Sequence, residues 1–303
     1  MPDKSENTES PAARQYWEQN PTAAALHQWT SNPIIAERVY RRMSAGATSK
    51  HWLSWLIEDY FAGRKFRSLL SPGCGTGDHE LAIARTNIVD QIDAFDFSEA
   101  SIAIARSNAE AAKARINYYT DNLNSFSIPK SKRYDLVLCS GSLHHVKDLE
   151  HFLGTVARAL ESDGYFIVNE YVGACYNIYP ARQLQLINRL LEKLPASLRS
   201  DAGDKVRNAT IQQAIETDAS ESVRSALITT FLPHYFDIEL MHPFGGALLH
   251  PMYPFLNHQA FTSGDEKTDT VLRLLAEFEE ILMELAGGLQ SDFCLFVCRP
   301  KRS

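Results

Sequence analysis

The sequence lacks several features that would each indicate a particular class of protein. Its five cysteines include no C-x-x-C pair, so neither a disulfide framework nor a structural zinc site is indicated. No apolar run approaches the roughly 18 residues that span a bilayer, and the polar start MPDKSENTES has no signal-peptide centre. The net charge is −7, without a basic tract to bind phosphates. We therefore expect a cytoplasmic protein with a small-molecule substrate and no nucleic-acid or membrane partner.

What is present is an alternation of short apolar runs and helical stretches. The runs lie at residues 66–70, 92–95, 116–119, 134–139 and 165–169. Strands separated by crossover helices predict a parallel sheet with helices on both faces. Two late strands are expected at residues 235–241 and 292–298. The sequence therefore predicts an α/β fold, a Rossmann-like doubly wound sheet of about seven strands.

The remaining segments are expected to surround this sheet. Residues 1–62 are predicted to form an N-terminal helical extension or lid, and residues 63–170 the cofactor-binding core that the late strands complete. Residues 171–234 and 242–291 are too long for simple loops, so we expect them to form a cap that carries the substrate pocket.

A glycine-rich turn follows the first expected strand, in the segment Ser71-Pro72-Gly73-Cys74-Gly75-Thr76-Gly77. Glycine has no Cβ, so alternate glycines let a ligand approach the backbone. The spacing is neither that of a dinucleotide site nor that of a lysine-bearing phosphate loop, and Asp78 would repel a pyrophosphate. The loop therefore suits a ligand without phosphates that carries an amino-acid end, such as S-adenosylmethionine.

Polar side chains follow the next two expected strands, where they would reach the same ligand. Asp96 can accept hydrogen bonds from both ribose hydroxyls, and Phe97 can lie against the adenine face. After the third strand, either Asp121 or Asn122 can accept from the adenine amino group. The backbone amide of the next residue, Asn122 or Leu123, would then donate to the adenine ring.

With these segments in this order, the sequence resembles the class I S-adenosylmethionine-dependent methyltransferases. The likeness rests on the glycine loop, Asp96-Phe97-Ser98, Asp121-Asn122, the strand Tyr134-Asp135-Leu136-Val137-Leu138-Cys139 and Leu143-His144-His145-Val146. It covers about residues 64 to 170, with the motifs in the family's order.

The resemblance implies a role for each motif. The loop residues Gly73, Cys74, Gly75 and Gly77 would bind the methionine portion of the cofactor, and Asp96 its ribose. The residue that ends the fourth strand, Cys139 or Ser140, would hold the methionine amine through its carbonyl, and the loop after it would face the methyl group. Ser71 stands where many members place an acid, so the ammonium group needs a negative partner elsewhere.

Three titratable side chains are candidates for accepting a proton from a substrate. His144 and His145 follow the fourth expected strand, beside the expected methyl group, and Glu170 ends the fifth. Imidazole is suited to proton transfer near neutral pH. The alternatives are backbone hydrogen bonds for the histidines and a salt bridge to the cap for Glu170. No metal-ligand constellation emerges beyond the adjacent histidine pair.

Aromatic and apolar residues in the later segments predict a pocket for a carbon-rich acceptor. The candidate lining residues are Tyr171, Tyr176, Tyr179, Phe244 and His250, with Tyr16 and Trp17 from the opening helix. Such a pocket favours C-methylation of a prenyl or terpenoid double bond followed by cation cyclisation, because aromatic faces stabilise carbocations. In this the chain resembles the teleocidin-type terpenoid-indole C-methyltransferases. O-methylation of a sugar or another secondary metabolite is the alternative.

The sequence also bears on other functional classes and on assembly. The glycine spacing disfavours a dehydrogenase, and a catalytically inactive cofactor-binding adaptor is the remaining alternative class. The opening helix with Tyr16 and Trp17 is interpreted either as a strut on its own domain or as a lid over the cofactor. As a lid it could be exchanged between the subunits of a homo-oligomer.

Overall fold

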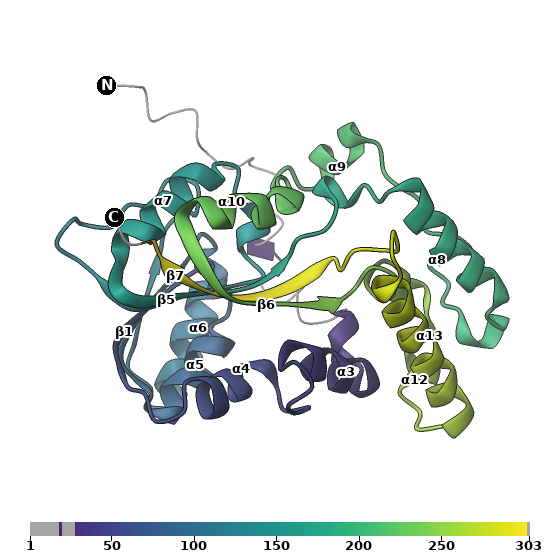
Figure 1. Cartoon of the computed structure of the whole chain (residues 1–303), viewed down its shortest axis with the longest axis horizontal. Coiled ribbons are helices and arrows are strands. Elements are labelled where there is room, and N and C mark those ends of the chain that lie inside the picture. Colours follow the sequence, from purple (N-terminus) through teal and green to yellow (C-terminus); the bar gives the residue numbers. More distant parts are fainter. Residues whose placement is uncertain (1–17, 20–27, 302–303) are drawn as a thin grey trace.

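The fold is built around one mixed sheet of seven strands in the order β3-β2-β1-β4-β5-β7-β6 (Figure 1). The computed structural model describes residues 18–19 and 28–301. The strands are β1 (Phe66–Pro72), β2 (Val89–Asp96), β3 (Ile116–Thr120), β4 (Tyr134–Ser140), β5 (Leu160–Tyr171), β6 (Phe236–Gly245) and β7 (Phe293–Pro300). Strands β1 to β5 run parallel, and β7 is antiparallel to both β5 and β6. The expected Rossmann-like doubly wound fold is confirmed.

The central strands are apolar on both faces because helices cover both sides of the sheet. Along β4, Leu136 and Leu138 enter one hydrophobic core, while Val137 and Cys139 enter the core on the opposite face. Successive side chains of a strand point to opposite faces, so a strand buried on both sides reads as a continuous apolar run. This is why the sequence shows uninterrupted apolar segments rather than an alternating pattern.

Two groups of helices cover these faces (Figure 1). On one side lie α3 (Pro33–Met43), α4 (Trp52–Trp55), the π-helical turn η3 (Leu56–Tyr60), α5 (Asp78–Thr86) and α6 (Glu99–Ala111). On the other side lie α7 (Leu149–Ala159) and α10 (Ile228–Tyr235). Residues 28–62 share the hydrophobic core beneath the sheet. The described part of the expected N-terminal extension is therefore a structural layer, and Tyr16 and Trp17 lie outside the described residues.

The two long insertions pack against one another. They contain α8 (Ala181–Lys193), α9 (Ile211–Thr217), α11 (Leu249–Met252), α12 (His258–Phe261) and α13 (Glu266–Glu284), with short turns η2 (Trp29–Ser31) and η4 (Leu143–His145) elsewhere. The remaining turns are η5 (Cys175–Asn177), η6 (Ala196–Leu198), η7 (Ser225–Leu227) and η8 (Tyr253–Phe255). The amide of Ser200 donates to the Phe255 carbonyl at 2.9 Å, and that of Asn257 to the Leu198 carbonyl at 3.0 Å. A cap built from both insertions is consistent with these contacts.

Strand β6 is longer than the sequence indicates. The expected strand at 235–241 continues to Gly245, into the segment that is expected to belong to the cap. The reason is pairing, because β6 pairs with β7 as far as the partners Gly245 and Phe293, with register shifts at Ile238/Leu240 and Pro243/Gly245.

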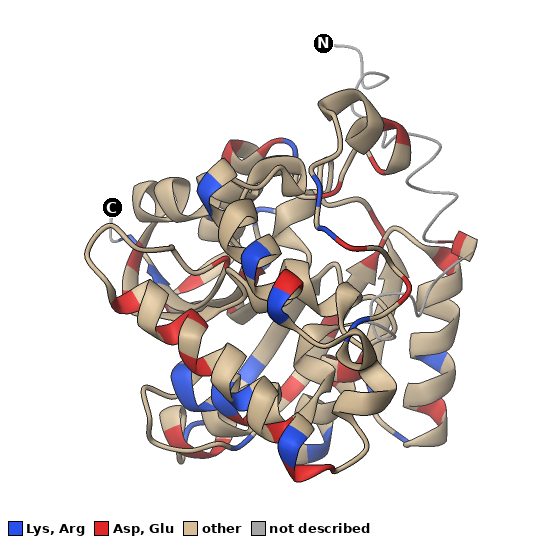
Figure 2. Cartoon of the chain, turned by 90° about the vertical axis from the view of Figure 1, so that its right-hand side faces the viewer, with Lys and Arg blue, Asp and Glu red and all other residues tan. Residues whose placement is uncertain are grey.

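Charges of both signs are interspersed over the helices on the face shown in Figure 2. Arg42 of α3, for example, pairs with Glu280 of α13 at 2.8 Å. This mixture does not form the continuous basic surface that a phosphate backbone requires. None of the helices within the described ranges has the length and apolar character needed to cross a membrane.

The glycine loop is tightly packed at Gly77, which lies at the start of α5. Its φ is +81°, and a Cβ there would lie 2.3 Å from Oη of Tyr118. Gly63 has a similar φ of +75°, and a Cβ at that position would meet nothing within 4 Å. We expect Gly63→Ala to lower the free energy of unfolding by about 1 kcal/mol through backbone strain alone. Gly77→Ala should lower it by about 3 kcal/mol, because steric overlap adds to strain. Urea denaturation measures both, and equal losses would contradict this packing.

Candidate functional site

The strand order places the candidate site at one edge of the sheet. The order changes direction between β1 and β4, and ligands bind outside the carboxyl ends of parallel strands at such a point. The loops after these strands touch, since Ser142 Oγ donates to the Pro72 carbonyl at 3.0 Å. A Cβ on Gly73 would lie 2.5 Å from Cβ of Ser142, whereas one on Gly75 would meet nothing within 4 Å. Gly73 is therefore required by packing, and Gly75 borders open space where a ligand can approach.

Asp96 links the end of β2 to this loop. Its Oδ2 accepts from the Gly75 amide at 2.9 Å, and its Oδ1 accepts from the Ser98 amide at 3.0 Å. Burial raises the pKa of Asp96. A carboxylate with one hydrogen bond to each oxygen keeps acceptor capacity, so Asp96 remains suited to ribose hydroxyls. Cys74 and Phe97, on either side of this contact, are partly buried.

The residues after β3 lie beside the same loop. Asn122 uses its Oδ1 to accept from the Asn124 amide at 2.8 Å, and Asp121 Oδ1 accepts from the Asn122 amide at 2.8 Å. A carboxylate has more acceptor positions than an amide oxygen, so Asp121 is the better candidate for the adenine amino group. Leu123 is buried, and its Cδ1 lies 3.4 Å from the position of a Cβ on Gly73.

The end of β4 carries Cys139 and Ser140, the two candidates for holding the methionine amine. Cys139 is fully buried in the core between the sheet and α7, with Ser142 and Glu170 near its thiol. Ser140 Oγ accepts from Nδ2 of Asn169 at 3.1 Å. That a carbonyl at this strand end meets the cofactor stays a prediction.

Glu80 is a site residue that sequence reasoning missed. It lies in the first turn of α5 with 1% of its surface exposed, and Ser71 Oγ donates to its Oε1 at 2.5 Å. Its Oε2 is buried and has no hydrogen-bond partner within the described part of the chain. Burial raises the pKa of Glu80 to about 7, and the nearby charges of Asp78 and Asp96 add to the effect.

These acids fit the cofactor that the sequence suggests. A buried carboxylate oxygen without a partner is costly unless a cation or a proton neutralises the group. S-adenosylmethionine carries an ammonium and a sulfonium, both positive. Glu80 is therefore a candidate for the negative partner that Ser71 cannot provide, and the sequence signal was an acid in the helix that directly follows the loop.

Glu170 lies where β5 ends and organises the loop after β4. Its Oε1 accepts from the amides of Ser142 at 2.6 Å and Leu143 at 2.5 Å. Its Oε2 accepts from Nδ1 of His144 at 2.8 Å and from the Tyr171 amide at 3.1 Å. The expected role as a proton acceptor for substrate is therefore corrected, because the carboxylate is 1% exposed and both oxygens are occupied. Glu170 is a positioning residue for His144.

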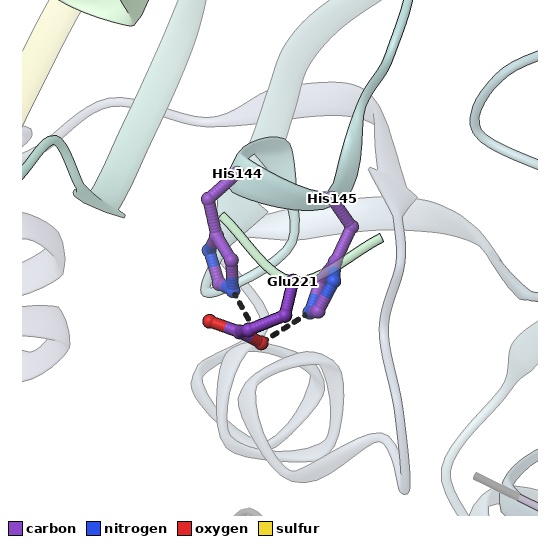
Figure 3. Close-up of side chains that lie close together, drawn as sticks. All are labelled: His144, His145 and Glu221. Carbon is purple, nitrogen blue, oxygen red and sulfur yellow. Dashed lines mark ion pairs between the residues drawn. The ribbon is translucent and has the colours of Figure 1, made fainter. Parts of the chain in front are cut away.

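Glu221, which the sequence did not single out, joins the two histidines (Figure 3). Its Oε2 lies 4.0 Å from Nε2 of His144 and 3.9 Å from Nε2 of His145. We call these three residues the His–Glu cluster. It comes from η4 and from the loop after α9, so only the tertiary fold brings its members together.

The charges in this cluster influence one another. Burial disfavours the charged form of His144, but Glu170 and Glu221 outweigh it and raise its pKa to about 9. Burial and the neighbouring His144 lower the pKa of His145. Burial would raise the pKa of Glu221, yet the two imidazoles lower it to about 2. Near pH 7 the cluster therefore holds a charged His144, a neutral His145 and an ionised Glu221.

An aromatic cluster adjoins His144. It consists of Tyr171, Phe244, His250 and Phe293. The centre of the Phe293 ring lies 5.2 Å from that of Tyr171, 5.6 Å from that of Phe244 and 5.0 Å from that of His250. The ring of Tyr171 is 6.3 Å from that of His144. His250 Nδ1 is buried without a hydrogen-bond partner among the described residues, and burial lowers its pKa to about 4. Three predicted substrate residues thus meet beside the histidine pair.

Tyr176 and Tyr179, the other predicted substrate residues that the structure describes, are not members of the aromatic cluster. Tyr179 is buried, and its amide donates to Oδ1 of Asn208 at 2.9 Å. Tyr176 has a φ of +55° in the turn η5, and its amide donates to the Ser222 carbonyl at 2.9 Å. The turn η5 is therefore fastened to the loop that carries Glu221.

Glu18 brings the opening part of the chain to the ribose side of the site. Its two carboxylate oxygens accept from the amides of Glu99 at 2.9 Å and Ala100 at 3.1 Å, at the start of α6. An acid at a helix N-terminus is favourable because it satisfies amides that have no partner within the helix. This contact lies close to Asp96, whose pKa Glu18 helps to raise.

Two curated methyltransferases are similar in sequence to part of this chain. The chain is 28% identical to the demethylmenaquinone methyltransferase of Leptospira interrogans over 113 residues, 37% of this chain and 45% of that protein. It is 28% identical to the ubiquinone biosynthesis O-methyltransferase of Rhodopseudomonas palustris over 163 residues, 52% of this chain and 58% of that protein. The chain thus spans about half the length of these curated relatives.

A solved structure and a family model complete the comparison. The crystal structure of the [4+2]-cyclase SpnF is similar with a TM-score of 0.48 and 17% identity, covering 98% of each chain. A model of the methyltransferase domain matches residues 66–226, which include the glycine loop, Asp96, Glu170 and the His–Glu cluster. The chain therefore belongs to the methyltransferase domain family, and its cofactor is S-adenosylmethionine.

Proposed function

We propose that this protein methylates a hydroxyl oxygen of a small, largely apolar acceptor that binds between the His–Glu cluster and the aromatic cluster. The observation that carries this proposal is the burial of two imidazoles and of Glu170 beside the loop after β4, where the methyl group is expected, with the partly exposed Glu221 next to both imidazoles. Buried ionisable groups are costly, and they gather where proton transfer is needed. A reaction at oxygen has such a need, because the hydroxyl must lose its proton.

Each residue of the site has a role in this reaction. The cofactor supplies an electrophilic methyl group when bound. Glu170 fixes η4 and the ring of His144, while Glu80, Asp96 and Asp121 hold polar groups of the cofactor. Nδ1 of His145 donates to the Ser220 carbonyl, 3.2 Å away, so its lone pair is on Nε2. With a lowered pKa, His145 is neutral near pH 7 and accepts the hydroxyl proton.

A second candidate reaction is C-methylation of a prenyl or terpenoid double bond, as in an indole alkaloid. The aromatic cluster favours it, because ring faces would stabilise the carbocation formed before cyclisation. This reaction is the first choice from sequence, but an alkene needs no base before it attacks the methyl group. It therefore leaves the charges of the His–Glu cluster unexplained, and for this reason we propose it second.

An acceptor panel distinguishes these reactions. The protein would be incubated with methyl-labelled cofactor and either apolar phenols and alcohols, prenylated indoles or sugar nucleotides. We expect label in an ether methyl group of an apolar hydroxyl compound, identified by mass spectrometry and NMR. Label only on the prenyl carbon would favour the second candidate, and label only in sugars would contradict an apolar acceptor.

His145→Asn should lower kcat at least a hundredfold, because the proton acceptor is lost. Affinity for the cofactor, measured by calorimetry, should stay unchanged, since the residue is assigned to the acceptor side. The matched control is His151→Asn, which removes an exposed imidazole of α7. An equal effect of both substitutions on kcat would contradict the assigned role.

Glu80→Gln should weaken binding of S-adenosylhomocysteine about tenfold to a hundredfold, because the ammonium group loses a buried ionic partner. The pKa of Glu80 is about 7, and the ammonium prefers the ionised carboxylate. Affinity of the natural protein should therefore fall as the pH drops below about 7, approaching tenfold per pH unit.

Calorimetry between about pH 5.5 and 8 measures both effects. The variant should lose the pH dependence. Asp78→Asn, which alters an exposed acid of the same helix, should keep it with a midpoint at slightly lower pH, because the charge of Asp78 helps to raise the pKa of Glu80. The same slope in the natural protein and in Glu80→Gln would show that the ammonium binds elsewhere.

A further inference from the structure

We infer that the His–Glu cluster is a binding site for a divalent transition-metal ion of the zinc or iron(II) class. Nε2 of His144, Nε2 of His145 and a carboxylate oxygen of Glu221 lie within 4.8 Å of one another (Figure 3). Ligands at about 2.0 to 2.2 Å from a common ion are separated by about 3.0 to 3.5 Å. Closure of these separations by up to about 1.5 Å would therefore place all three around one ion.

Each ligand is already oriented by a second contact. Nδ1 of His144 donates to Glu170 at 2.8 Å, and Nδ1 of His145 donates to the Ser220 carbonyl at 3.2 Å. Both rings therefore direct Nε2 toward Glu221. Metal-binding histidines typically donate their other ring nitrogen to a carboxylate or a backbone carbonyl in this way.

Glu221 is oriented from its opposite oxygen. Its Oε1 accepts from Oγ of Ser222 at 2.7 Å and from Nδ2 of Asn177 at 3.2 Å, while Oε2 is the atom near the imidazoles. Second contacts on all three ligands amount to a site whose geometry is set before any ion arrives. A set of side chains that met only by chance would not share this arrangement.

The charge and ligand types determine the class of ion. Two imidazole nitrogens and one carboxylate oxygen suit zinc or iron(II), whereas calcium and magnesium prefer oxygen ligands. Glu170 and Glu221 bring two negative charges to the pair. A divalent ion would replace the second proton of His144, which must leave before Nε2 can bind the ion, and would offset both charges. Three protein ligands also leave coordination positions open.

The open positions suggest what the ion does, and this part rests on the proposed function. An acceptor hydroxyl bound to the ion would be more acidic and fixed in position. With the ion bound, Nε2 of His145 is a ligand, so the O–H bond would break with the proton passing to water, as the new O–C bond forms and the cofactor's S–C bond breaks. Without the ion, His145 is the proton acceptor.

Metal binding is measured on the full chain without acceptor or cofactor. After dialysis against a chelator, titration with Zn²⁺ should show one tight equivalent, and Co²⁺ should give a visible absorption band. Glu221→Gln and His144→Asn should each weaken binding at least a hundredfold, and Glu170→Gln about tenfold to a hundredfold. Glu216→Gln, an exposed acid of the neighbouring α9, is the control and should bind normally.

The outcomes separate the two proposals. Absence of a tight equivalent, or equal affinity in the natural protein and in Glu221→Gln, would overturn the metal site. Circular dichroism and binding of S-adenosylhomocysteine check that each variant is folded. A protein that binds metal but methylates no hydroxyl would contradict only the proposed function. One that methylates fully after chelation and binds no metal would overturn only the metal site.

Discussion

The carboxylate of Glu170 is the interaction on which the geometry of the site depends. One buried side chain satisfies two backbone amides of the loop after β4 and also fixes the ring of His144. Such a carboxylate is stable in the interior only because each oxygen has several donors. The strand end of β5 thereby sets the position of the strand end of β4, and the placement of both imidazoles follows from that connection.

The glycine loop and Asp96 could be predicted because their signals are local. A loop between a strand and a helix, followed by an acid at the next strand end, already implies a common sheet edge. The position of Glu80 was harder to predict, because its contact with Ser71 depends on how α5 packs against the sheet. Glu221 could not be predicted, since its segment follows a long insertion and reaches the histidines only in the folded chain.

The fold was predictable for the same physical reason. Strands β1, β4 and β5 are buried on both faces, and their apolar runs are unambiguous between helical segments. The end of β6 could not be predicted. The sequence from Met241 to Gly245 contains proline and glycine, and its pairing depends on β7. The insertions were expected to form a cap, but the arrangement of their helices could not be predicted, because helix periodicity does not specify the partner of an apolar face.

The contact of Glu18 with the start of α6 has a thermodynamic consequence. The carboxylate of Glu18 binds the turn that also carries the Ser98 amide bound to Asp96, so this contact and ribose binding would favour the same conformation of the turn. Coupled equilibria are reciprocal, so the contact of Glu18 would strengthen nucleoside binding to the extent that the nucleoside strengthens the contact. Replacing the Glu18 side chain would thus alter ligand affinity from outside the part of the site where the methyl group is transferred.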